Sequence, residues 1–200
     1  MQLERWGPPQ QECRGLVLLL HGGKPRSTQA VDARSASWRR VRALGRDLSP
    51  GLHEAGLAVW VHRFTERGWN GDGADRIADA RDALIEAKEL EVPVVVLGHS
   101  MGARTAVQVA DEPHVTGVVA LAPWFDPRDP VRALAGKRLV AAHGTRDRIT
   151  SAKATQAYLR RAAAVAEVEY VDMGPLGHYL LTGRRRWNDV GVDSCLDMFT

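Results

Sequence analysis

The feature that most constrains how this chain folds is an alternation between short apolar runs and longer amphipathic segments. The runs cover residues 15–20, 57–64, 93–97, 115–121, 138–143 and 168–171. Most are continuously apolar, as in strands that have helices on both faces. The amphipathic segments predict helices over residues 38–54, 75–90, 101–110, 129–135, 151–165 and about 187–199. Strand–helix alternation of this kind predicts an α/β fold with a doubly wound, mostly parallel sheet flanked by helices.

The composition is that of one folded domain. The chain has 200 residues, of which 44% are hydrophobic and 26% are charged. These fractions argue against a disordered chain, a coiled coil and a collagen-like repeat. At roughly 150 residues per domain, the length predicts a single domain over residues 1–200. Cys13 and Cys195 are too few and too far apart to indicate a disulfide framework, so we expect free thiols.

Charge and hydropathy bear on the partners. The net charge of +3 is too small to indicate a nucleic-acid partner. The longest apolar run, residues 16–20, is far too short to cross a bilayer. The first 14 residues lack the apolar segment of a signal peptide. We therefore expect a cytoplasmic monomer or homodimer with no nucleic-acid or membrane partner.

The turn after residues 93–97 carries the strongest catalytic signal. Gly98-His99-Ser100-Met101-Gly102 matches the pattern G-x-S-x-G, between an apolar strand and a helix rich in small residues. A sharp strand-to-helix turn strains the central residue and presents its hydroxyl over the sheet, and the flanking glycines avoid a clash between crowded backbones. The alternative is an ordinary glycine-rich turn with a passive serine.

A serine nucleophile needs a base, and the base needs an orienting acid. Asp147 lies in the turn after the strand at residues 138–143, and His178 follows the last predicted strand. The carboxyl ends of parallel strands meet at one edge of a sheet, so both residues are expected beside Ser100. Asp126 and Asp129, in the turn after the preceding strand, are the rival acids. Asp147 has a second interpretation as a cap of the helix that begins near residue 151.

These features resemble the α/β-hydrolase family. The motifs that carry the resemblance are His21-Gly22-Gly23, the G-x-S-x-G turn, His143-Gly144-Thr145-Arg146-Asp147 and the late Gly177-His178-Tyr179. The resemblance extends from about residue 15 to the last helix. It implies Ser100 as the nucleophile, Asp147 as the acid and His178 as the base. It also implies an oxyanion hole formed by the backbone N–H groups of Met101 and Gly23.

The connections predict a minimal member of this family. Only sixteen residues separate the strands at 115–121 and 138–143, which leaves no room for a cap domain, and the N-terminal strands of larger members are largely absent. We therefore expect an open site. Trp124 and Trp69 follow strands and are candidate substrate-binding residues, although aromatic side chains more often fill the core. Lys24 is a candidate contact for an anionic substrate group, with simple surface exposure as the alternative.

The sequence thus predicts a serine hydrolase that cleaves a small carboxylic ester through an acyl-enzyme. A thioesterase, a short-peptide or amide hydrolase with the same triad, and a receptor-like protein with little turnover are the alternatives. No cofactor or metal is expected, because His53 has no partner histidine four residues later. His143 is expected in the core or behind the acid, and His99 beneath the serine turn. The expected partner is a small-molecule acyl substrate.

Overall fold

The computed structural model describes residues 2–9 and 12–200, and within them seven strands form one sheet in the order β1-β3-β2-β4-β5-β6-β7. The strands are β1 (Gln2–Trp6), β2 (Gly15–Leu20), β3 (Leu57–Arg63), β4 (Val94–His99), β5 (Val115–Leu121), β6 (Arg138–His143) and β7 (Glu167–Asp172). Strands β2 to β7 are parallel, and β1 pairs with β3 in the antiparallel direction. The predicted mostly parallel α/β sheet is confirmed.

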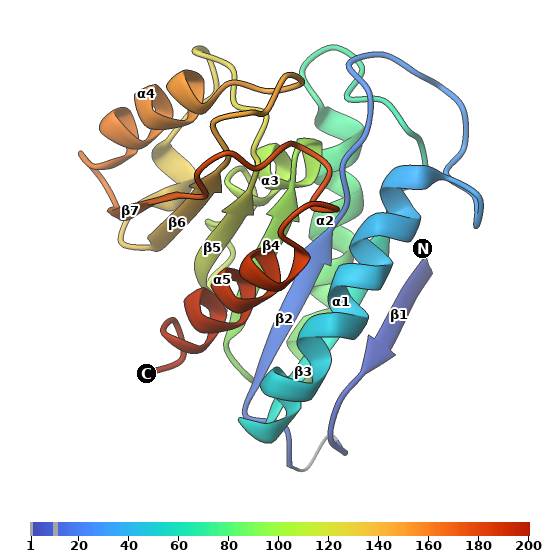
Figure 1. Ribbon diagram of the computed structural model, residues 1–200. Coiled ribbons are helices and arrows are strands. Elements are labelled where there is room, and N and C mark those ends of the chain that lie inside the picture. Colours follow the sequence, from blue (N-terminus) through green and yellow to red (C-terminus); the bar gives the residue numbers. More distant parts are fainter. Residues whose placement is uncertain (1, 10–11) are drawn as a thin grey trace.

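Helices cover both faces of this sheet. They are α1 (Ala36–Glu54), α2 (Ala74–Ala87), α3 (Met101–Ala106), α4 (Ala152–Ala162) and α5 (Arg184–Leu196), with the short 3₁₀ helices η2 (Lys88–Leu90) and η3 (Arg132–Leu134). Figure 1 shows α1 and α5 in front of the sheet and α2 and α3 behind it. The carboxyl ends of the parallel strands point to the top of this view, where the connecting loops gather. This arrangement is the predicted doubly wound fold.

The apolar runs form the centre of the sheet because both of their faces are covered. All residues of β2 and of β4 are buried. Helix α1 buries a stripe of apolar side chains with helical spacing, namely Trp38, Val41, Leu44, Leu48 and Leu52. Each such side chain contributes about 1.5–3 kcal/mol when fully buried. No helix in residues 2–9 and 12–200 is long and apolar enough to span a membrane.

Three predicted helices are shorter than expected, and the one at 151–165 spans only Ala152–Ala162. The predicted helix at 129–135 is reduced to η3, because Pro130 disfavours a helical conformation at Asp129. The Asp129 carboxylate also accepts a hydrogen bond from the Asp126 N–H at 2.8 Å, which forms a local turn instead. The predicted helix at 101–110 ends at Ala106, and tight turns follow. Its β-branched residues, Thr105, Val107 and Val109, lower the helix propensity there.

The edges of the fold also differ from the prediction. The sequence did not predict β1, whose five residues include Glu4 and Arg5 and which shields the edge of the sheet beside β3. Charged residues of this kind are common on edge strands and weaken the apolar signal. The last helix spans Arg184–Leu196 rather than about 187–199, and Gly183 precedes it with a φ of +65°.

Candidate active site

Ser100 occupies a strained turn between β4 and α3. Its φ is 57° and its ψ is −115°, a conformation that costs a residue with a side chain about 1–3 kcal/mol. Backbone hydrogen bonds hold the turn in place: the Ser100 N–H donates to the Leu121 carbonyl at 3.1 Å, and the Ser100 carbonyl accepts from the Trp124 N–H at 3.2 Å. The end of β5 therefore fixes the position of the serine.

The two glycines of the motif are required by close packing. A Cβ atom on Gly98 would lie 2.4 Å from the Ala103 backbone, and one on Gly102 would lie 2.1 Å from the Leu20 carbonyl oxygen. Real Cβ contacts are essentially never this short. The crowding that the motif predicts is therefore present on both sides of Ser100.

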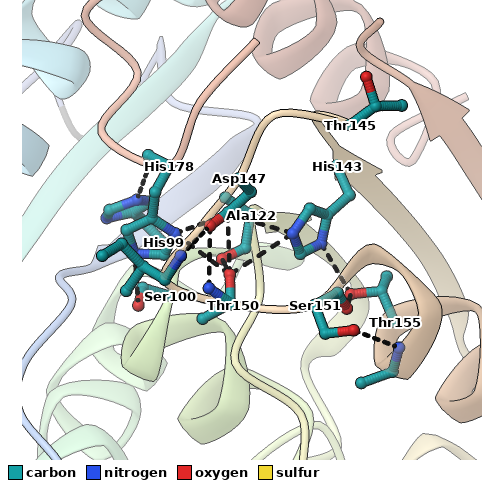
Figure 2. Close-up of polar contacts among 12 residues, drawn as sticks. His99, Ser100, Ala122, His143, Thr145, Asp147, Thr150, Ser151, Thr155 and His178 are labelled. Carbon is teal, nitrogen blue, oxygen red and sulfur yellow. Dashed lines mark hydrogen bonds and ion pairs between the residues drawn. The ribbon is translucent and has the colours of Figure 1, made fainter. Parts of the chain in front are cut away.

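The structure brings Ser100, His178 and Asp147 together from three separate loops. His178 Nε2 lies 3.0 Å from Ser100 Oγ, and His178 Nδ1 lies 2.8 Å from Asp147 Oδ2. Figure 2 shows the three side chains in this order. Ser100 and His178 are only 7% and 6% exposed. Neighbouring residues therefore cover most of both side chains.

The Asp147 carboxylate accepts hydrogen bonds on both oxygens. Oδ1 accepts from the N–H groups of Ile149 and Thr150 at 2.7 and 2.8 Å. Oδ2 contacts His178 Nδ1, the Thr150 hydroxyl at 2.8 Å and His143 Nε2 at 3.1 Å. Burial raises the pKa of Asp147, but the hydrogen bonds from His143, His178 and the backbone outweigh it and hold the pKa well below its ordinary value. Asp147 is thus an anion throughout the neutral pH range.

The carboxylates of the two rival acids, Asp129 and Asp126, pair with arginine side chains. The Asp129 carboxylate is paired with the buried guanidinium of Arg104 at 2.6–2.9 Å. Asp126 is bonded to Arg128 at 3.0 Å, which contributes most to lowering the pKa of Asp126 to about 2. The geometry therefore favours Asp147 over both as the partner of His178.

His99 supports the loop that carries His178. Its Nε2 lies 2.9 Å from the His178 carbonyl oxygen, and the two rings are 5.0 Å apart. Burial lowers the pKa of His99 to about 3, so this ring remains neutral and donates its Nε2 proton to the carbonyl. The predicted position of His99, packed beneath the turn, agrees with these contacts.

The two predicted oxyanion-hole residues lie side by side. Met101 is the first residue of α3, so its N–H has no acceptor within the helix. A Cβ atom on Gly23 would lie 2.5 Å from the Met101 side chain, and one on Gly22 would lie 3.2 Å from Ser100 Cβ. The loop after β2 therefore passes directly along the Ser100 turn. Glycine is required at position 23, because a Cβ atom there would also lie 2.4 Å from the backbone carbonyl oxygen of Arg67.

Neighbouring loops hold this segment rigidly. The Lys24 N–H donates to the Arg67 carbonyl at 2.7 Å, and the Trp69 N–H donates to the Lys24 carbonyl at 2.8 Å. His21 Nε2 accepts a hydrogen bond from the Phe64 N–H at 3.1 Å, so its Nδ1 carries the proton and donates to the Gly22 carbonyl at 2.6 Å. Burial lowers the pKa of His21 to about 3 and keeps this neutral form. A fixed backbone of this kind suits a preorganised oxyanion hole.

The three predicted substrate-binding residues differ in accessibility. Lys24 is exposed, and its side chain has no hydrogen bond or ion pair among the residues that the structure describes. Trp124 is partly buried, and Trp69 is only 3% exposed. The two indoles pack edge to face with their ring centres 6.2 Å apart, and the Arg104 guanidinium lies against both, 4.3 Å from the Trp69 ring and 4.6 Å from the Trp124 ring. Of the two tryptophans, Trp124 offers the more accessible surface.

A groove of about 900 Å³ adjoins these residues between the loop after β5 and the loop after β6. Its lining includes Trp124, Asp126, Asp147, Arg148 and Ile149. The groove gives a small ligand room next to the acid and next to Trp124. Among residues 2–9 and 12–200, no group of three or more histidine, cysteine, aspartate or glutamate side chains is arranged to hold a metal ion.

Sequence reasoning missed the ion pair of Arg104 with Asp129 and the hydroxyl of Thr150. Arg104 stands four residues after Ser100, but nothing in the motif marks an arginine at this place. Thr150 stands three residues after Asp147, the spacing at which an aspartate carboxylate commonly accepts a local backbone hydrogen bond. That spacing is a weak signal from which Thr150 could have been found.

Comparisons with known proteins bear on the family and the fold. Residues 17–194 match the model of the alpha/beta hydrolase family. No curated protein matches the chain. Among solved structures, it is similar to Est1E from Butyrivibrio proteoclasticus bound to ferulic acid (TM-score 0.69, 16% identity, covering 98% of this chain and 94% of that one). It is also similar to the butyrate-bound thermophilic esterase Est2 from Thermogutta terrifontis (0.73, 15%, 98% and 88%).

A third similar structure is the monoacylglycerol lipase from Paleococcus ferrophilus (TM-score 0.66, 18% identity, covering 99% of this chain and 100% of that one). At these identities the structural likeness shows the fold alone. The family model, in contrast, matches most of the sequence. With a doubly wound sheet and a strained serine turn between β4 and α3, this chain belongs to the α/β hydrolase family.

Proposed function

We propose that this protein is a serine hydrolase that cleaves small carboxylic esters through an acyl-enzyme. The observation that carries the proposal is the continuous chain of contacts from Ser100 Oγ through the His178 ring to Asp147, at 3.0 and 2.8 Å. A receptor-like pocket has no need for a strained serine aligned with a histidine and a buried carboxylate.

In the first half of the reaction, Ser100 Oγ attacks the ester carbonyl carbon while His178 Nε2 takes the hydroxyl proton. The carbonyl oxygen becomes an oxyanion beside the N–H groups of Met101 and Gly23. One donor of this kind contributes about 2.7–4 kcal/mol to transition-state stabilisation in related chemistry. Asp147 holds the His178 ring with Nε2 toward the serine and stabilises the imidazolium that forms.

Collapse of the tetrahedral intermediate breaks the bond to the alcohol oxygen, which receives the proton from His178 Nε2. The product alcohol leaves, and the acyl group remains on Ser100. Water then donates a proton to His178 and attacks the acyl carbon, and a second collapse releases the carboxylic acid and returns the proton to Ser100. The ester and one water molecule are the only reactants that these steps need.

The surroundings of Ser100 favour a small acyl group. Trp69 is nearly covered by its neighbours, because Trp124 and the Arg104 guanidinium both pack against its ring. A long acyl chain would need this space, whereas a short one needs only the partly exposed Trp124 side. Two of the similar structures hold small carboxylic acids, ferulic acid and butyrate, which is the product class of the proposed reaction.

Hydrolysis of p-nitrophenyl acetate, butyrate and octanoate by the wild type and Ser100→Ala tests this function. We expect turnover that decreases with chain length and falls by about 10⁴–10⁶ in Ser100→Ala. Matched oxygen esters and thioesters of the same acyl group then separate an esterase from a thioesterase. Turnover that survives in folded Ser100→Ala would refute the proposal.

A further inference from the structure

Asp147 lies between two histidines, and only one of them faces the nucleophile. Figure 2 shows His178 and His143 on opposite sides of the carboxylate. His143 Nε2 lies 3.1 Å from Asp147 Oδ2, the same oxygen that His178 Nδ1 contacts at 2.8 Å. The His143 side chain is 0% exposed. The reaction proposed above assigns no role to His143.

The contacts of His143 determine which nitrogen carries a proton. An ionised carboxylate only accepts hydrogen bonds, so the proton toward Asp147 belongs to His143 Nε2. On the other side of the ring, His143 Nδ1 lies 2.8 Å from Thr155 Oγ1 at the start of α4. Both ring nitrogens are therefore held by fixed partners, and His143 cannot turn away without leaving a buried polar atom unpaired.

We propose that His143 is a positioning residue that shares the negative charge of Asp147 with His178 and so limits how strongly Asp147 holds a protonated His178 ring. This inference rests on the proposed function. Each donor to a carboxylate withdraws charge from its other donors, so the hydrogen bond from His143 weakens the attraction between Asp147 and a protonated His178.

Other titratable and charged groups near His178 have different roles. His99, on β4, packs against the ring but is kept neutral by burial. Tyr179 adjoins the ring at 5.4 Å, and the Arg40 guanidinium of α1 lies 4.6 Å from the Tyr179 ring. None of these groups bonds to Asp147 in the part of the chain that the structure describes, so replacing His143 changes the charge on Asp147 without removing them.

The proposal predicts that replacing His143 moves the kcat/KM profile in one direction, whereas a mere loosening of the structure would move it in the other. In His143→Leu, Asp147 loses a hydrogen-bond donor, and its negative charge then attracts a protonated His178 more strongly. The acidic limb of the kcat/KM profile then moves to higher pH by about 0.5–1 pH unit. If His143 only filled space, its loss would let Asp147 drift from His178, and the limb would move to lower pH.

The experiment compares three variants with the wild type. His143→Leu removes the donor, and His143→Gln returns an amide N–H near the position of Nε2. His62→Leu is the matched control, because His62 is another buried strand histidine and has no hydrogen bond to the triad. We expect the upward shift in His143→Leu, a profile for His143→Gln closer to the wild type, and no shift in His62→Leu.

Ring titration of His178 by NMR in the same variants requires no turnover. An upward midpoint shift in His143→Leu without any hydrolysis would retain this inference and refute the proposed function. An unchanged or lowered midpoint would overturn the inference, whatever the activity. If His143→Leu does not fold, the test is made on the wild type by ¹⁵N NMR of its histidine rings. We expect an exchange-protected proton on His143 Nε2. The absence of this proton would overturn the proposal.

Discussion

Replacing Gly102 by alanine tests how closely the nucleophile turn is packed. The new Cβ atom would lie 2.1 Å from the Leu20 carbonyl oxygen and 2.5 Å from its carbon. Both atoms belong to the backbone of the central strand β2, so a side-chain rotation cannot relieve the clash. Because Cβ contacts under 3.0 Å are essentially never seen, α3 has to move by about 1 Å away from β2.

This displacement has separate consequences for stability and for catalysis. Overpacking costs about 1–3 kcal/mol, and the usual gain from glycine to alanine in a helix returns about 0.4–1 kcal/mol. We therefore expect a net loss of about 1–2 kcal/mol in the free energy of unfolding. The Ser100–His178 contact is 3.0 Å, and a shift of about 1 Å there is expected to lower kcat by about 10²-fold.

Urea denaturation and p-nitrophenyl acetate hydrolysis measure both effects. Gly51→Ala is the matched control, because Gly51 also lies within a helix but its Cβ would meet only the two Val192 methyl groups, at 3.3 and 3.8 Å. We expect this control to unfold at the same or a higher urea concentration than the wild type. If Gly102→Ala were as stable and as active as Gly51→Ala, the close approach of α3 to β2 would be refuted.

Three further predictions concern the triad, pH and acyl length. Asp147→Asn removes the charge that orients and stabilises His178, so kcat/KM for p-nitrophenyl butyrate is expected to fall by about 10³–10⁴; a loss of only a few-fold would contradict the triad. Burial lowers the pKa of His62 to about 4, so below the ordinary value of 6.5 the unfolded chain binds a proton that the folded one does not, and stability is lost as pH falls. Between pH 8 and pH 5, His62→Leu is therefore expected to lose about 2 kcal/mol less unfolding free energy than the wild type in urea titrations, and equal losses would contradict the buried neutral ring. Trp124→Ala is expected to raise kcat/KM for octanoate relative to acetate by about tenfold, and an unchanged ratio would place the acyl pocket elsewhere.

Much of the catalytic edge is accessible to sequence reasoning because it depends on local rules. Continuous apolar runs identify the buried strands, and the carboxyl ends of parallel strands share an edge. Ser100, Asp147 and His178 each follow such a strand, so their proximity follows from topology alone. The two glycines around Ser100 predict close packing of this turn, and the structure shows that packing against Leu20 and Ala103.

Other features depend on side chains whose contacts are set only in the folded chain. Arg104 packs against two indoles that come from the loops after β3 and β5, and no sequence spacing relates these three residues. The depth of Ser100 depends on how several loops cover it. Strand β1 gave no signal, because its charged residues read as an ordinary polar N-terminus.

Labelling with a fluorophosphonate probe tests the central claim, that Ser100 is an activated nucleophile, most directly. The serine oxygen displaces fluoride and forms a stable bond to phosphorus, which mass spectrometry locates without knowledge of the natural substrate. We predict one label per chain on the peptide that contains Ser100, with no label in folded Ser100→Ala. An unlabelled wild type, or a label on another residue that persists in Ser100→Ala, would contradict the account.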